Sequence, residues 1–103
     1  MAAQVIIREY ANLAVAFGNL IQAPAEPAIA DQTITTILTT SVPSAAFNIN
    51  TRMIAVSTPA AEGVTCEFGA APVAEAGNFL LPGNSVFFFG VRPGDKVAFF
   101  ELA

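Results

Sequence analysis

Apolar and polar side chains alternate along most of this chain with the two-residue period of a β-strand, and no segment shows a convincing helical period of about 3.6 residues. β-branched and aromatic residues fill these segments, and Gly, Pro, Asn and Asp residues fall between them. The pattern predicts strands over Gln4–Tyr10, Leu13–Gln22, Thr33–Thr40, Ala45–Asn50, Arg52–Thr58, Val64–Gly69, Ser85–Val91 and Lys96–Leu102. We therefore expect an all-β fold: a single antiparallel β-sandwich, jelly-roll-like, with about seven or eight strands.

The N-terminal segment has two open interpretations. Gln4–Tyr10 has a strand pattern but no turn signal that would join it to Leu13–Gln22 in a hairpin, and two prolines separate both from the threonine-rich middle of the chain. A helix over Leu13–Gln22 is disfavoured by its β-branched and glycine residues. We expect one domain over residues 1–103, in which residues 1–27 either form an extended arm that pairs with a neighbouring chain or contribute a strand to their own sandwich.

The strongest local signal is the run Val91-Arg92-Pro93-Gly94-Asp95-Lys96. Proline followed by glycine fits the two central positions of a type II turn, in which the glycine takes a positive φ. The turn predicts a hairpin between Ser85–Val91 and Lys96–Leu102. Asp95 can be read as an ion ligand or as a turn residue that bonds to nearby backbone, and turn chemistry favours the second reading.

The run Phe87-Phe88-Phe89 is apolar on both faces of its strand, because consecutive side chains point to opposite sides. A two-layer sandwich covers only one face of each sheet, so we expect the other face to meet another subunit. The apolar N-terminal strand offers a similar surface. The candidate interface residues are Val5, Ile6, Ile7, Phe87 and Phe89.

The composition supports a covered surface. Hydrophobic residues make up 54% of the chain and charged residues 12%, about half of the roughly 25% that is typical of soluble domains. Either Thr, Asn, Ser and Gln supply the polar surface, or neighbouring subunits cover part of it, and we favour the second. The net charge is −4. The few cations are scattered, which argues against nucleic acid or an anionic membrane as a partner.

The residues needed for most catalytic chemistry are missing. The chain has no histidine, which removes the commonest general base and metal ligand. Cys66 is the only cysteine, so an internal disulfide and a cysteine-based zinc site are excluded. Its spacing from Val64 and Phe68 predicts a small buried side chain rather than a reactive thiol. We expect no enzyme activity, no catalytic residues, no cofactor and no metal, although a pair of carboxylates in a cleft is not excluded by sequence.

Two runs in the C-terminal half show a familiar order of strands and turns. They are Gly63-Val64-Thr65-Cys66-Glu67-Phe68-Gly69-Ala70-Ala71-Pro72-Val73-Ala74 and Phe79-Leu80-Leu81-Pro82-Gly83-Asn84-Ser85-Val86-Phe87-Phe88-Phe89-Gly90-Val91-Arg92-Pro93-Gly94-Asp95-Lys96-Val97-Ala98. This layout resembles small β-sandwich virion proteins of tailed bacteriophages, typically capsid decoration or cement proteins. The resemblance covers residues 63–100.

The resemblance implies a non-enzymatic role on the outer surface of a phage head, where the protein would bridge subunits of the major capsid protein. It also implies a homo-oligomer, either a trimer or a dimer, made in the cytoplasm of the host bacterium. Two alternatives remain: a tail or baseplate subunit, and a carbohydrate- or ligand-binding β-sandwich module. The second is disfavoured because sugar sites use exposed Trp and Tyr platforms, and this chain has no Trp and one Tyr.

Overall fold

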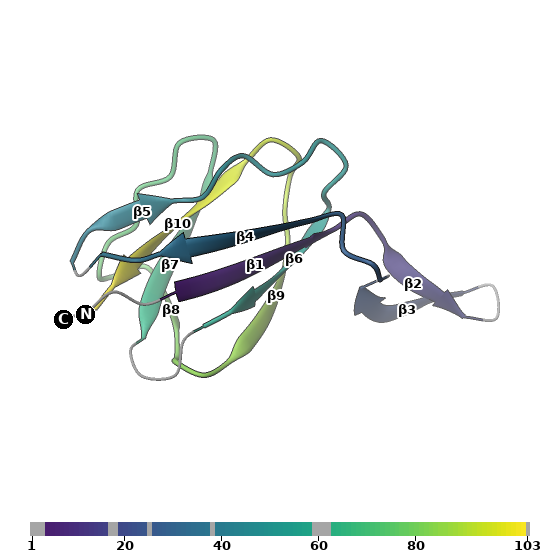
Figure 1. Ribbon diagram of the computed structural model, residues 1–103, viewed down its shortest axis with the longest axis horizontal. Coiled ribbons are helices and arrows are strands. Elements are labelled where there is room, and N and C mark those ends of the chain that lie inside the picture. The colour runs from purple at the N-terminus through teal and green to yellow at the C-terminus, as the bar shows by residue number, and fades with distance from the viewer. Residues whose placement is uncertain (1–3, 17–18, 25, 38, 59–62, 103) are drawn as a thin grey trace.

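The computed structural model describes residues 4–16, 19–24, 26–37, 39–58 and 63–102 (Figure 1). Within these ranges the secondary structure consists of strands and turns, without a helix. The strands are β1 (Gln4–Tyr10), β2 (Leu13–Ala16), β3 (Asn19–Pro24), β4 (Ala30–Thr35), β5 (Ser41–Pro43), β6 (Met53–Ser57), β7 (Val64–Gly69), β8 (Phe79–Leu81), β9 (Val86–Gly90) and β10 (Lys96–Glu101).

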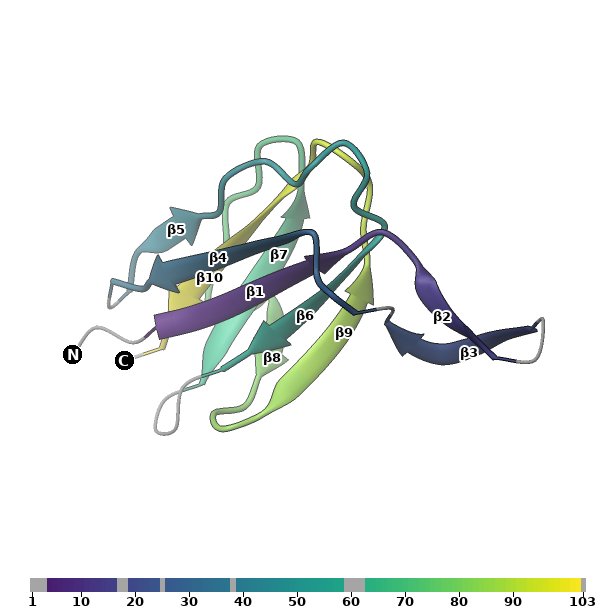
Figure 2. The ribbon, with the colours of Figure 1, turned by 45° about the vertical axis from the view of Figure 1, so that its right-hand side comes forward.

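Eight of these strands form two antiparallel four-stranded sheets, which confirms the predicted all-β class. Sheet 1 has the order β4-β1-β6-β9, and sheet 2 has the order β5-β10-β7-β8. The chain passes from one sheet to the other at every connection between these strands except β1–β4 and β7–β8. Figure 2 shows the two layers beside each other, with the β2–β3 hairpin outside them.

Alternate side chains of the two sheets point into one shared hydrophobic core. Strand β1 shows the period most clearly, because exposed and buried residues alternate from Gln4 to Glu9. Phe68 of β7 and Phe89 of β9 join the sheets, with ring centroids 5.0 Å apart. The buried core residues are Val5, Ile7, Ile34, Phe47, Ile54, Val56, Val64, Cys66, Leu81, Val97 and Phe99.

Three of the predicted strands need correction. The segment predicted as one strand over Leu13–Gln22 is a hairpin of β2 and β3. Ala45–Asn50 is not a strand. Its backbone bonds to the side chains of Gln32 and Glu9 and to the turn at residues 94–95, and not to one neighbouring strand. The strand predicted over Thr33–Thr40 begins earlier and ends at Thr35. Strand β8 was not predicted, since its three residues are too few to show a period.

The turn at residues 91–96 forms as predicted, but the hairpin does not. Gly94 has a φ of 81°, and the amide of Asp95 donates to the carbonyl of Arg92 at 3.2 Å. However, β9 pairs with β6 in sheet 1, whereas β10 pairs with β5 and β7 in sheet 2. Both strands carry an apolar face, and a crossing between the sheets lets those two faces meet in the core.

The N-terminal segment, for which two interpretations were open, lies in its own sheet over Gln4–Tyr10 and projects beyond it over β2 and β3. Strand β1 is an inner strand of its own sheet, paired with β4 on one side and β6 on the other. The segment that projects is the β2–β3 hairpin, which pairs only within itself among the described strands and extends away from both sheets (Figures 1 and 2). Its base is fastened where the Tyr10 hydroxyl donates to the Glu26 carboxylate at 2.7 Å.

A buried carboxylate holds the crossing from β5 to β6 in place. Glu9 is 2% exposed, and its Oε1 accepts from the Thr51 hydroxyl at 2.7 Å and from the Asn48 amide at 2.8 Å. Its Oε2 accepts from the Gln32 side chain at 3.0 Å. A buried charge is tolerated when it is hydrogen-bonded in this way. Glu9 therefore attaches the loop of residues 44–52 to β1 and β4.

Replacing Glu9 is expected to destabilise the fold strongly. Glu9→Ala leaves several donors unpaired in a buried place, so the free energy of unfolding should fall by about 3 kcal/mol. Urea denaturation followed by circular dichroism measures this change. The control is Asp31→Ala, which removes the exposed ion pair with Arg8 and should cost far less, because such pairs contribute little in water. Equal losses for the two variants would contradict the role given to Glu9.

Candidate interaction surface

The five residues predicted as an interface lie on different sides of the sheets. Val5 and Ile7 are fully buried in the core, and Phe87 and Phe89 are partly buried and pack against it. Only Ile6 is on the outer surface, where it is 45% exposed. Four of the five predicted residues therefore face the core. The residues between them on β1 and β9, Ile6 and Phe88, face outward.

The outer face of sheet 1 is largely apolar. In the register of the sheet, Ile6 lies opposite Ser57, and Ser57 lies opposite Val86. In the next row, Ala55 lies opposite Phe88. Val86 and Phe88 are 57% and 58% exposed. We call this surface the outer apolar face, and its residues are Ile6, Val86 and Phe88, which are exposed, Met53, which is partly buried, and Ala55, which is buried between them.

The outer face of sheet 2 is covered in part by the protein itself. Thr65 and Ala98 point outward from β7 and β10, yet both are buried. The loop of residues 70–78 lies over them: the Thr65 hydroxyl donates to the carbonyl of Glu75 at 2.7 Å, and the amide of Ala74 donates to the Ser41 hydroxyl at 2.9 Å. The loop therefore covers the part of this outer face around Thr65 and Ala98, whereas Leu80, opposite Thr65 on the same face, stays 50% exposed.

The side of the molecule formed by β8 and β9 is also apolar. Phe79 and Leu80 of β8 are 59% and 50% exposed. The Phe79 ring contacts the Phe89 ring edge-on, with centroids 6.0 Å apart. This contact places the edge strand of sheet 2 next to the edge strand of sheet 1. The apolar surface thus reaches the edges of both sheets on this side.

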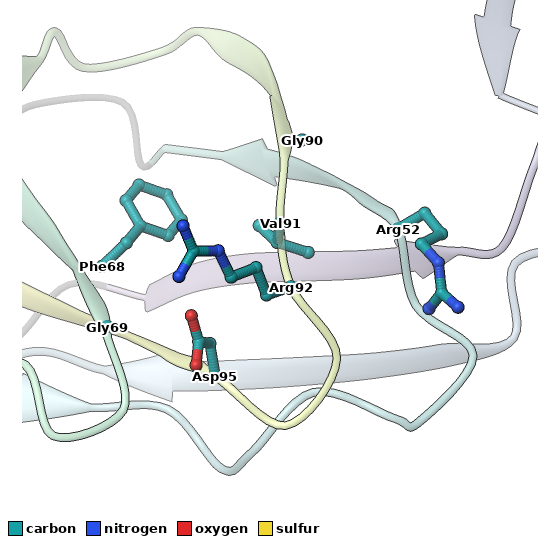
Figure 3. A pocket seen from close by; sticks show the side chains of 7 residues that line it. All are labelled: Arg52, Phe68, Gly69, Gly90, Val91, Arg92 and Asp95. Atoms are coloured by element: carbon teal, nitrogen blue, oxygen red, sulfur yellow. The ribbon is translucent and has the colours of Figure 1, made fainter.

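A cleft at one end of the sheets is the other candidate site. Its volume is about 510 Å³, and Figure 3 shows the residues that line it: Arg52, Phe68, Gly69, Gly90, Val91, Arg92 and Asp95. The guanidinium group of Arg92 lies between the Phe68 ring and the Asp95 carboxylate, whereas that of Arg52 lies on the other side of Val91. Arg52 instead donates to the carbonyls of Ile49 and Thr51, at 3.2 and 3.3 Å.

The cleft does not bring catalytic groups together. The two guanidinium groups do not converge on one point, and Asp95 is the only carboxylate among the described residues that line the cleft. The backbone of Asp95 bonds to Arg92 and Phe47, which agrees with the turn reading of this residue. Among the described residues, no group of three or more His, Cys, Asp or Glu side chains could hold a metal ion. None of the described segments is a helix that could span a membrane.

Cys66 lies in the core and not at either candidate site. It is 2% exposed and unpaired, as its spacing in the strand predicted. Burial, followed by the neighbouring charge of Glu67, raises the pKa of its thiol to about 11. The thiolate is the nucleophilic form, so this cysteine is protonated and shielded near neutral pH.

Comparisons with known proteins add no constraint on the function. A scan against models of protein families, a search of curated proteins and a search of solved structures each found no match.

The Cys66 thiol is expected to resist modification in the folded protein. Near pH 8, a thiol reagent such as iodoacetamide should label it slowly, because a pKa of about 11 leaves little thiolate and burial blocks access. The same reagent should label it readily in denaturant. Mass spectrometry of the intact protein measures the labelled fraction. Fast labelling under native conditions would show that β7 does not bury Cys66 as described.

Proposed function

We propose that this protein is a non-enzymatic structural protein of a phage particle, most specifically a capsid decoration protein that packs against the major capsid protein. The observation that carries the proposal is the outer apolar face of sheet 1, where Ile6, Val86 and Phe88 are 45%, 57% and 58% exposed, whereas a loop covers the outer face of sheet 2 around Thr65 and Ala98. Apolar patches on folded proteins commonly mark surfaces where another chain binds.

The charge distribution supports a protein partner. Arg8 and Asp31 also point outward from sheet 1, but they pair with each other at 3.0 Å. The remaining outward residues of β6 and β9 carry no charge. Depletion of charged residues together with enrichment of aromatic and methionine side chains is typical of the buried centre of a protein interface. A nucleic-acid surface would require clustered cations instead.

The order of the strands supports the proposal that this chain is a virion protein. The strand orders β4-β1-β6-β9 and β5-β10-β7-β8, with most connections alternating between the sheets, favour a jelly-roll-like sandwich. This architecture is common among viral capsid proteins and lectins. The motifs that resemble phage decoration proteins form the loop over sheet 2 and the turn between β9 and β10. The proposed location is the outer surface of the head, with a tail or baseplate position as the nearest alternative.

The carbohydrate-binding alternative has less support. The cleft contains one aromatic ring, that of Phe68, and the guanidinium group of Arg92 lies beside that ring. A sugar site would instead present an open aromatic platform with several converging polar groups.

Electron cryo-microscopy of virions from the phage that encodes this chain tests the proposed location. The expected result is density for a small two-sheet domain on the outer surface of the head, in contact with the major capsid protein. Density on the tail or baseplate would overturn the decoration role, and absence of the chain from virions would overturn the structural role as a whole.

A matched pair of variants tests whether the outer apolar face makes the contact. Ile6→Lys places a charge on that face and should lower incorporation into particles at least about tenfold, because an unpaired ammonium group is costly to bury. Ile49→Lys is the control, since Ile49 is 77% exposed and lies in the loop between β5 and β6, outside the strands that form this face. Quantitative mass spectrometry of purified virions gives the ratio. Normal incorporation of Ile6→Lys would contradict the assignment of this face.

A further inference from the structure

Strand β9 is an edge strand of sheet 1, paired with β6 on one side only. The hydrogen bonds at the two ends of this pair show which residues of β9 bond inward. The Thr58 amide donates to the carbonyl of Ser85 at 2.8 Å, and the Val91 amide donates to the carbonyl of Arg52 at 3.0 Å. Because bonded positions alternate along an antiparallel pair, positions 87 and 89 also bond to β6. The backbone groups of Val86, Phe88 and Gly90 point to the open edge.

This edge lacks the features that usually prevent pairing with another strand. Natural edge strands are typically short, charged, interrupted by proline or covered by other segments. Strand β9 has five residues without a charge or a proline. The other edges of the two four-stranded sheets differ: β5 and β8 have three residues each, and β5 ends in Pro43. Strand β4 carries Asp31, and the Gln32 side chain bonds it to Ala45.

The fold of a single chain does not require glycine at position 90. Gly90 does not have a positive φ, in contrast to Gly69 and Gly94. A Cβ atom added at this position would meet only the carbonyl of Arg52 at 3.9 Å, which is an ordinary contact. Its own fold would therefore accept a larger side chain here. A small residue at an open edge leaves space for a side chain from a second strand.

We propose that β9 pairs with β9 of a second copy of this chain, antiparallel, about a two-fold axis at Phe88. The three residues that face the open edge are symmetric about Phe88. In this register Phe88 lies opposite Phe88 of the second copy, and Val86 lies opposite Gly90 of that copy. All three pairs are hydrogen-bonded positions, so each open backbone group of these residues finds a partner. The two aromatic side chains then contact each other across the strands.

The second strand comes from another copy of this chain, because β9 itself contains both residues that face each other in this register, Val86 and Gly90. An isologous contact requires a surface that complements itself, and a bulky residue at one end of the edge with glycine at the other meets this requirement. The pair joins two copies of sheet 1 into one continuous eight-stranded sheet. This inference goes beyond the proposed function, since the pairing needs no capsid.

Opposite charges at position 88 test the pairing directly. Phe88→Lys and Phe88→Glu each place two like charges opposite each other in the dimer, which destabilises a strand pair. Light scattering after size-exclusion chromatography should show the wild-type chain at twice the 10.7 kDa of one copy, and each variant at 10.7 kDa. An equimolar mixture of the two variants should return to the dimer mass, because lysine then faces glutamate.

The control is Thr33→Lys, a charge on the same outer face but on the opposite edge strand β4, and it should remain dimeric. Circular dichroism confirms that each variant is folded. A wild-type chain that stays monomeric at high concentration overturns the proposal. Variants that remain dimeric, or a mixture that stays monomeric, overturn the pairing centred on Phe88. Failure of capsid binding with an intact dimer would count only against the proposed function.

Discussion

The hydrogen bond from the Thr65 hydroxyl to the carbonyl of Glu75 determines much of what this molecule can do. It holds the loop of residues 70–78 over the outer face of sheet 2, together with the bond from the Ala74 amide to the Ser41 hydroxyl. The part of that face around Thr65 and Ala98 is thereby buried. On sheet 1, by contrast, the outward side chains of Ile6, Val86 and Phe88 remain exposed. This difference between the two sheets is the basis for the proposed role in binding other chains.

The crossings between the sheets place β9 at an open edge. A hairpin between β9 and β10 would have put both strands in one sheet, with β10 covering the edge that is now free. The turn at Gly94 instead carries the chain across the core, and β10 becomes an inner strand between β5 and β7. At the same end of the molecule, Glu9 fixes the loop that leads into β6. These connections leave Phe88 exposed and Phe87 and Phe89 in contact with the core.

The sequence predicts the positions of the strands better than it predicts which strands pair with each other. Strands β1 and β7 match the predicted bounds, because each shows a period and has turn residues at its ends. The runs Val5-Ile6-Ile7 and Phe87-Phe88-Phe89 are apolar in both phases, so only the pairing of β1 and β9 in sheet 1 decides which side faces inward. The role of Glu9 is also invisible in the sequence, since its donors lie more than 20 positions away.

Hydrogen–deuterium exchange of the assembled protein tests the central claim that other chains bind to the open side of sheet 1. Amide exchange reports which backbone groups gain hydrogen bonds or lose contact with water. On assembly, exchange should slow in β9, at Val86 and Phe88, and stay unchanged in the loop of residues 70–78 that already covers sheet 2. Unchanged exchange in β9 together with new protection in that loop would show that the partner binds to the opposite side.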